Sequence, residues 1–245
     1  MLSIRTGLSK ARWDRVLRKG AHAPAVRWRP AFNRGPNHPM ARPRSPGFND
    51  QRDLIVAKAA GLFARRGYLG TTISDVTEAC GLQKPTLYHY FKDKEELLMS
   101  IADLHVSKLF NLVHDVESRT RPGPERLQSL ITRFLSEYAN AQDAHRVLTE
   151  DVKYLADDKR SIIADKERQV VAAFSSAIAA TRPDIKRAKL EKPVAMLLFG
   201  MLNWMFTWLR PEGRLTHADM APVVVQLFVG GLEHIALPLE RKSRR

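Results

Sequence analysis

A segment near the first third of the chain, residues 71–94, constrains the fold more than any other. It reads TTISDVTEACGLQKPTLYHYFKDK. Apolar residues recur here at intervals of three and four, which predicts a short amphipathic helix. Its apolar face is expected to hold Ile73, Val76, Ala79 and Cys80. Thr72 followed by Asp75 is a capping box at the start of this helix. Gly81 is expected to end it, because glycine adopts the left-handed conformation at little cost.

A second short helix is predicted directly after this glycine. Lys84, Pro85 and Thr86 open it, and proline is tolerated there because first-turn amides have no partner within the helix. Asp93 with Glu96 then predicts the capped start of a third helix. Two short helices joined by a glycine turn, the second one polar and aromatic, are typical of a helix-turn-helix.

The longer segment GLFARRGYLGTTISDVTEACGLQKPTLYHYFKDKEELL resembles the DNA-binding domain of TetR/AcrR-family transcriptional regulators. The FxxxGY, TT, GxxxxTLYxYF and KEEL elements stand in the family's order and spacing, over about residues 51–101. Two positions depart from the pattern. Asp93 replaces a common Ser and is an equally good helix cap, whereas Gln83 is a poorer cap than the Ser often found there. The start of the recognition helix is therefore expected to be less firmly held.

The resemblance implies a DNA-binding domain over residues 50–99, with the helix-turn-helix motif at 72–91. It assigns phosphate contacts to Thr71, Thr72, Tyr88, Tyr90 and Lys94. It assigns base-edge contacts in the major groove to Lys84, Pro85, Thr86 and His89. The alternative for Tyr88 is a buried tyrosine with its hydroxyl satisfied, and that for Lys94 is a solvated surface lysine. Double-stranded operator DNA is the expected partner.

The net charge of +14 is concentrated at the two ends of the chain. Residues 1–49 hold eleven Lys and Arg, one Asp and six of the fourteen prolines, which predicts a disordered basic extension. Such an arm could add phosphate contacts. The alternative is that residues 1–39 are an over-extended gene start and that Met40 begins the protein. Residues 240–245 are read as a short basic tail.

The remaining sequence predicts an all-α chain, with a helical effector-binding and dimerisation domain over 100–239. An apolar stripe at Ile55, Ala59, Leu62 and Phe63 predicts a helix at about 50–66. Further helices are expected at about 94–117, 125–140, 144–156 and 159–180. The apolar stretch 193–209 is shorter than the roughly twenty residues that span a bilayer, so no membrane association is expected. With 221–235 it is read instead as the homodimer interface that the family builds from its last two helices.

Residues 200–215, GMLNWMFTWLRPEGRL, resemble TetR regulators that respond to acyl-CoA thioesters. On one continuous helix, Asn203, Trp204, Thr207 and Trp208 share a face with Gly200, and this strip is predicted to contact the effector. The alternative is that the tryptophans anchor the core or the dimer. Partners are expected for the Asn203 and Thr207 polar groups, either from other side chains or from a filled cavity. Basic residues at 159, 160, 166 and 168 could meet CoA phosphates or form a solvated helix face.

No catalytic or metal-binding motif is present in the sequence. HExxH, CxxC, the P-loop and GxSxG are all missing, so no enzyme activity, catalytic residue, metal or cofactor is expected. The single cysteine, Cys80, excludes an intramolecular disulfide. The chain is predicted to be a cytoplasmic, homodimeric, ligand-responsive repressor. An efflux-pump repressor that responds to hydrophobic or cationic drugs is the alternative.

Overall fold

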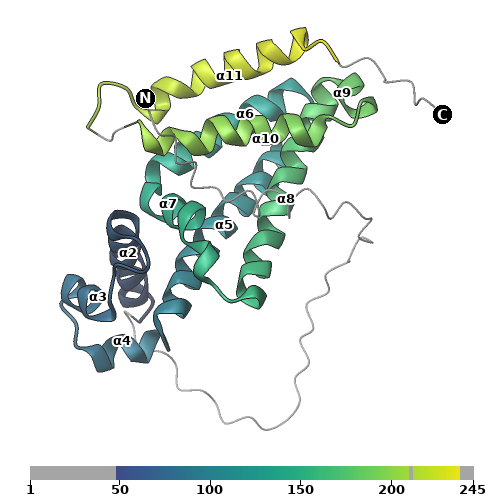
Figure 1. The fold of residues 1–245 in the computed structure, drawn as a ribbon. Helices are drawn as coiled ribbons and strands as arrows, with labels where there is room; N and C mark the ends of the chain where they lie inside the picture. The colour runs from purple at the N-terminus through teal and green to yellow at the C-terminus, as the bar shows by residue number, and fades with distance from the viewer. Residues whose placement is uncertain (1–47, 210–211, 238–245) are drawn as a thin grey trace, which may run out of the picture.

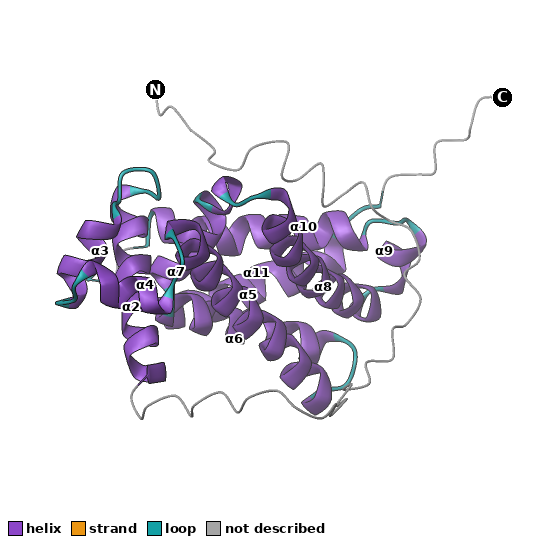
Figure 2. Ribbon diagram, turned by 90° about the horizontal axis from the view of Figure 1, so that it is seen from below, coloured by secondary structure: helices purple, strands orange, loops and turns teal. Residues whose placement is uncertain are grey.

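The computed structural model describes residues 48–209 and 212–237, and within these ranges it contains helices and loops without a strand (Figure 2). The all-α prediction is therefore confirmed. The predicted basic extension lies outside the described residues except for Phe48 and Asn49, which begin the first helix. The predicted tail at 240–245 also lies outside them. None of the described helices is long and apolar enough to cross a membrane.

Three helices form the end of the molecule that carries the helix-turn-helix (Figure 1). They are α2 (Phe48–Arg66), α3 (Ile73–Cys80) and α4 (Lys84–Tyr90). The predicted stripe of the first helix is buried: Ile55, Ala59, Leu62 and Phe63. On α3 the prediction needs one correction, because Ala79 is exposed and Thr77 is buried in its place. Thr77 tolerates burial because its hydroxyl donates to the Ser74 carbonyl at 2.9 Å.

One long helix, α5 (Lys94–Arg119), joins this end to the rest of the chain. The predicted domain boundary at 99/100 falls inside it, so the two parts share an unbroken helix. Leu97, Leu98, Ile101 and Val113 are buried along α5, whereas Leu104 is 39% exposed.

The second part of the molecule is a bundle built around α5. Its elements are α6 (Pro124–Asn140), α7 (Gln142–Glu150), the 3-10 turn η1 (Val152–Tyr154), α8 (Asp157–Thr181), α9 (Pro183–Arg187), α10 (Glu191–Trp204), the 3-10 turn η2 (Met205–Thr207) and α11 (His217–His234). Phe134, Phe174 and Phe199 meet at the centre, with ring centroids 4.8–6.3 Å apart. In Figure 1, α11 lies across the end of the bundle farthest from α3 and α4.

The expected helix at 193–209 is not continuous. The α-helix ends at Trp204 and one 3-10 turn follows. The Thr207 hydroxyl donates to the Trp204 carbonyl at 2.6 Å, a local side-chain bond that competes with the helical ladder. Because a 3-10 turn has three residues per turn instead of 3.6, Thr207 and Trp208 do not continue the face that Asn203 occupies. The prediction that Asn203, Trp204, Thr207 and Trp208 lie on one face of a continuous helix is therefore wrong.

Candidate nucleic-acid interface and effector site

The helix-turn-helix is held by caps at both ends of α3. The Thr72 hydroxyl accepts from the Asp75 amide at 3.2 Å, and the Asp75 carboxylate accepts from the Thr72 amide at 2.7 Å. This second bond is the largest cause of a lowered Asp75 pKa. Gly81 follows with φ +65°, and its amide donates to the Glu78 carbonyl at 3.1 Å. The capping box and the glycine turn, both predicted, fix the direction in which the chain enters α4.

The recognition helix α4 presents an uncovered polar face. Lys84, Pro85, Thr86, Tyr88 and His89 are exposed, and Tyr88 is 51% exposed, which excludes the buried-tyrosine alternative. Leu87 is fully buried and anchors the helix to the three-helix core. Tyr90 is half-buried against Phe48, with ring centroids 4.6 Å apart. Gln83 makes no side-chain capping bond, as its poor capping propensity predicts.

Two residues assigned to phosphates are engaged inside the protein. Thr71 is fully buried, and its hydroxyl donates to the Gly67 carbonyl at 3.0 Å. The predicted contact between the Thr71 side chain and DNA is therefore corrected, because this side chain holds the loop between α2 and α3. Lys94 donates to the carbonyls of Tyr68 and Thr71 at 3.0 and 2.9 Å, which occupies two of its three N–H groups.

The same loop contacts the larger bundle. The Tyr68 ring stacks on Tyr154 of η1, with centroids 5.5 Å apart. The Asp151 carboxylate accepts from the Tyr68 amide, and burial raises its pKa. On α5, Glu95 accepts from the amide of Ala156 at 2.7 Å. The segment between α7 and α8 is therefore bonded both to the helix-turn-helix loop and to the first turn of α5.

The predicted effector strip separates into an inner and an outer part. Asn203 points inward, and its side-chain oxygen accepts from the Tyr138 hydroxyl at 3.0 Å. Trp204 and Trp208 are 44% and 48% exposed on the single chain. The expected partners of Asn203 and Thr207 are thus protein groups: the Tyr138 hydroxyl and the Trp204 carbonyl.

Asn203 belongs to a buried polar cluster that the sequence did not predict. The His105 Nε2 lies 3.3 Å from His145 Nδ1, and His145 stacks on Tyr138 at 3.8 Å between centroids. Burial raises the pKa of Tyr138 and lowers that of His105 to about 4. We call His105, Tyr138 and His145, together with the half-buried Asn203 at their edge, the buried polar cluster. The available signal was weak, since it consisted of single polar residues within the apolar faces of separate helices.

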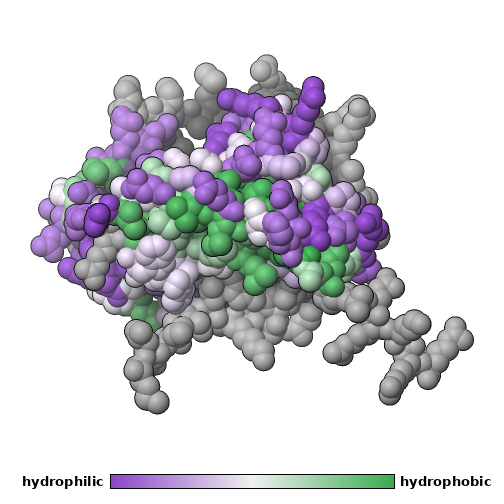
Figure 3. Space-filling model, turned by 90° about the horizontal axis from the view of Figure 1, so that it is seen from above, coloured by the Kyte–Doolittle hydropathy of each residue, from purple (hydrophilic) through white to green (hydrophobic). Residues whose placement is uncertain are grey.

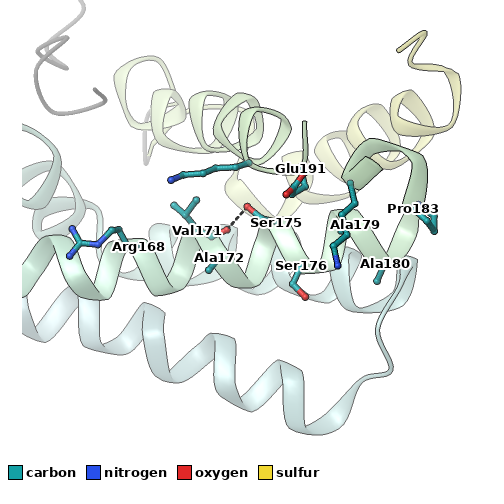
Figure 4. A pocket seen from close by; sticks show the side chains of 11 residues that line it. Arg168, Val171, Ala172, Ser175, Ser176, Ala179, Ala180, Pro183 and Glu191 are labelled. Atoms are coloured by element: carbon teal, nitrogen blue, oxygen red, sulfur yellow. Dashed lines mark hydrogen bonds between the residues drawn. The ribbon is translucent and has the colours of Figure 1, made fainter. Parts of the chain in front are cut away.

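The basic residues considered for CoA phosphates are paired with carboxylates. Their pairs are Lys159–Glu95, Arg160–Asp157, Lys166–Asp103 and Arg168–Asp165. Arg168 also lines a groove of about 720 Å³ between α8, α9 and α10, together with Lys186 and Lys192 (Figure 4). Ala172 and Ser176 contribute to the groove wall. The groove lining therefore holds three basic side chains and one carboxylate, that of Glu191.

An apolar surface runs over the last two long helices. Leu197 on α10 is 69% exposed, and Val223 and Leu227 on α11 are 50% and 65% exposed. Figure 3 shows hydrophobic residues gathered into a band on this side of the molecule. Within the part of the chain that the structure describes, no group of three or more His, Cys, Asp or Glu side chains is placed to hold a metal ion.

Comparisons with known proteins agree with this geometry. The model of the family "Bacterial regulatory proteins, tetR family" matches residues 55–101, and the model "Tetracyclin repressor-like, C-terminal domain" matches residues 120–232. Between them they cover the helix-turn-helix and most of the bundle.

Individual relatives extend the match along the chain. A TetR-family regulator from Bordetella parapertussis 12822 is 33% identical, with 77% of this chain and 99% of that chain covered and a TM-score of 0.72. The transcriptional repressor KstR2 of Mycobacterium tuberculosis is 25% identical over 190 residues, 75% of this chain and 94% of KstR2. The structure of AibR in complex with isovaleryl coenzyme A and operator DNA is 23% identical, covers 72% and 97% of the two chains, and has a TM-score of 0.63. The chain belongs to the TetR family of bacterial transcriptional regulators.

Proposed function

We propose that this regulator is a cytoplasmic homodimeric repressor that binds a two-fold symmetric operator through α4 and releases it when an acyl-CoA binds. The DNA part of this proposal rests on the exposed polar face of α4, which follows the capped helix α3 and the Gly81 turn. Lys84 can donate to guanine O6 and N7, and Thr86 can contact a base edge or a thymine methyl. In this proposal, Tyr88 and the third N–H of Lys94 donate to backbone phosphates.

The apolar surface of α10 and α11 supports the dimer. Contiguous exposed apolar surface of this kind is usually a protein interface, and both stretches are too short for a bilayer. Trp204 and Trp208, exposed on one chain, can be covered by the partner subunit. A two-fold axis would set the two recognition helices in successive major grooves, about 34 Å apart.

In this proposal, the acyl-thioester group of the ligand binds at the buried polar cluster. Polar side chains inside an apolar core offer the few oriented hydrogen bonds that a small-molecule site needs. The groove with Arg168, Lys186 and Lys192 would receive phosphates of the CoA. AibR shows that a protein of this fold can hold isovaleryl coenzyme A together with operator DNA.

The contacts around Tyr68 provide a route from the effector to DNA. A ligand that separates α6, α7 and α10 would displace η1, which stacks on Tyr68 through Tyr154. Tyr68 in turn holds Lys94 and the entrance to α3. Release requires that the ligand bind the DNA-incompetent state more tightly, because equal affinity for both states shifts no population.

The test is release of operator DNA by a ligand panel. The panel contains acyl-CoAs of several chain lengths, the matching free acids and cationic drugs, and release is followed by fluorescence anisotropy. We expect the CoA thioesters to release the operator. Asn203→Ala should raise the concentration needed, whereas Ser118→Ala, a change in an exposed residue of α5, should not. Release by a drug or a free acid, with no response to any thioester, would reject the acyl-CoA and favour the efflux-type regulator.

A further inference from the structure

Three aromatic side chains meet where the start of α2 contacts the end of α4. Phe48 is the first residue of α2, and His89 and Tyr90 are the last two residues of α4. The ring centroid of Phe48 lies 4.6 Å from that of Tyr90 and 6.0 Å from that of His89. The centroids of His89 and Tyr90 are 5.7 Å apart. We call these three residues the aromatic triad, and it joins two helix ends that are far apart in the sequence.

Two aromatic contacts restrict the His89 ring. Its plane lies at 84° to the Phe48 ring and at 82° to the Tyr90 ring, and aromatic pairs favour this edge-to-face arrangement. His89 is nevertheless exposed, whereas Phe48 and Tyr90 are half-buried. The imidazole therefore has a defined orientation and is still accessible to DNA.

The start of α2 is itself fixed beside α4. The Arg52 Nη2 donates to the Ser100 Oγ at 3.2 Å, and the Arg52 guanidinium lies over the Phe91 ring, 5.2 Å from its centroid. Phe91 directly follows α4 and is 1% exposed. These contacts hold the first turns of α2 against the end of α4, so Phe48 is a fixed support for the imidazole.

The orientation of an imidazole decides what it can recognise. Its two ring nitrogens differ, since in the neutral ring one donates a hydrogen bond and the other accepts one. An unrestrained surface ring samples several rotamers, and ordering it on DNA costs conformational entropy. A ring that its neighbours already hold avoids part of this cost and presents one edge to the base pairs. The triad thus has the geometry to sharpen the base preference of His89.

We propose that Phe48 is a positioning residue for DNA recognition, which orients His89 and thereby sets the base preference at the operator position that His89 reads. This inference rests on the proposed reading of operator DNA by α4, and it adds a residue that lies outside the helix-turn-helix. Phe48 acts through His89 and makes no base contact of its own. Loss of its ring frees the imidazole, so discrimination falls at one base pair while the charged contacts to phosphates remain.

The experiment is binding-site selection with the full chain, followed by anisotropy measurements on the selected DNA and its single-base variants. His89→Ala identifies the position that His89 reads. We expect Phe48→Leu, which keeps an apolar side chain without a ring, to lower the preference at that position about 3- to 10-fold, the range expected for one aromatic pair. Phe48→Tyr retains the ring and should restore the preference. Neither Phe48 variant should change the slope of log affinity against log salt, because neither removes a charge.

Two further proteins separate positioning from a general effect on folding. With His89→Ala already present, Phe48→Leu should have no additional effect on base preference. Leu54→Ala, at an exposed apolar residue of the same helix, should leave every preference unchanged. Thermal unfolding is measured for each protein, and Phe48→Met serves if Phe48→Leu does not fold.

Four results would overturn the proposal. They are full preference retained by Phe48→Leu, an equal loss at every operator position, the same effect of Phe48→Leu with and without His89, and no position at which His89→Ala loses preference. Selection of no sequence by the wild-type protein would reject operator recognition as well. Failure of the proposed function is therefore distinguished from failure of this inference.

Discussion

The buried His105 makes the stability of this protein sensitive to mild acid. Burial lowers its pKa in the folded protein to about 4, from an ordinary value of 6.5. Protonation therefore favours the unfolded chain, and the stability that the neutral ring confers is complete above pH 6.5 and lost as the pH falls toward 4. At about 1.4 kcal/mol per pH unit, the full difference is roughly 3 kcal/mol. About 2 kcal/mol of it should disappear between pH 7.5 and pH 5.

The assay is urea unfolding at these two pH values and one protein concentration, since dimer stability depends on concentration. His105→Phe keeps an aromatic ring and removes the titration. We expect the wild-type protein to lose about 2 kcal/mol more than this variant as the pH is lowered. His114→Gln, at an exposed histidine of the same helix, should behave as wild type. Equal losses in the wild type and His105→Phe would refute the argument that the ring is buried and neutral.

Five further outcomes follow from the described contacts. Gly81→Ala should lower stability by about 1 kcal/mol in thermal unfolding, because φ is +65° there. Lys94→Met should lower stability by about 2 kcal/mol, through loss of two charged hydrogen bonds, and weaken DNA binding in gel shifts. Lys84→Ala should relax base preference in binding-site selection, whereas Tyr88→Phe should weaken binding to all DNA sequences alike. Tyr154→Ala should leave operator affinity nearly unchanged in anisotropy but raise the effector concentration needed for release.

Local sequence rules were sufficient for the helix-turn-helix. The Thr72–Asp75 capping box and the Gly81 turn involve only residues that are close together in the sequence. Both could therefore be predicted directly. The exception is Thr71, whose hydroxyl bonds to the Gly67 carbonyl in the core. Its burial depends on how α2 and α3 pack, and spacing alone does not report that.

In the effector region, by contrast, local sequence rules were not sufficient. An apolar stretch at 193–209 predicted one long helix, but the Thr207 hydroxyl and the following 3-10 turn separate Asn203 from the tryptophans. The buried polar cluster joins His105, Tyr138 and His145 from three helices. Such a meeting depends on tertiary packing and has no periodic signature in the sequence.

The most direct test of the central claim is selection of genomic fragments by the purified protein, followed by footprinting of the enriched site. We predict a two-fold symmetric sequence whose half-sites lie about one helical turn apart. Its affinity should fall steeply as salt rises, and Lys84→Ala together with His89→Ala should abolish the preference for it over random DNA. Enrichment of no sequence at any salt concentration, or a preference that the double variant retains, would contradict operator recognition through α4.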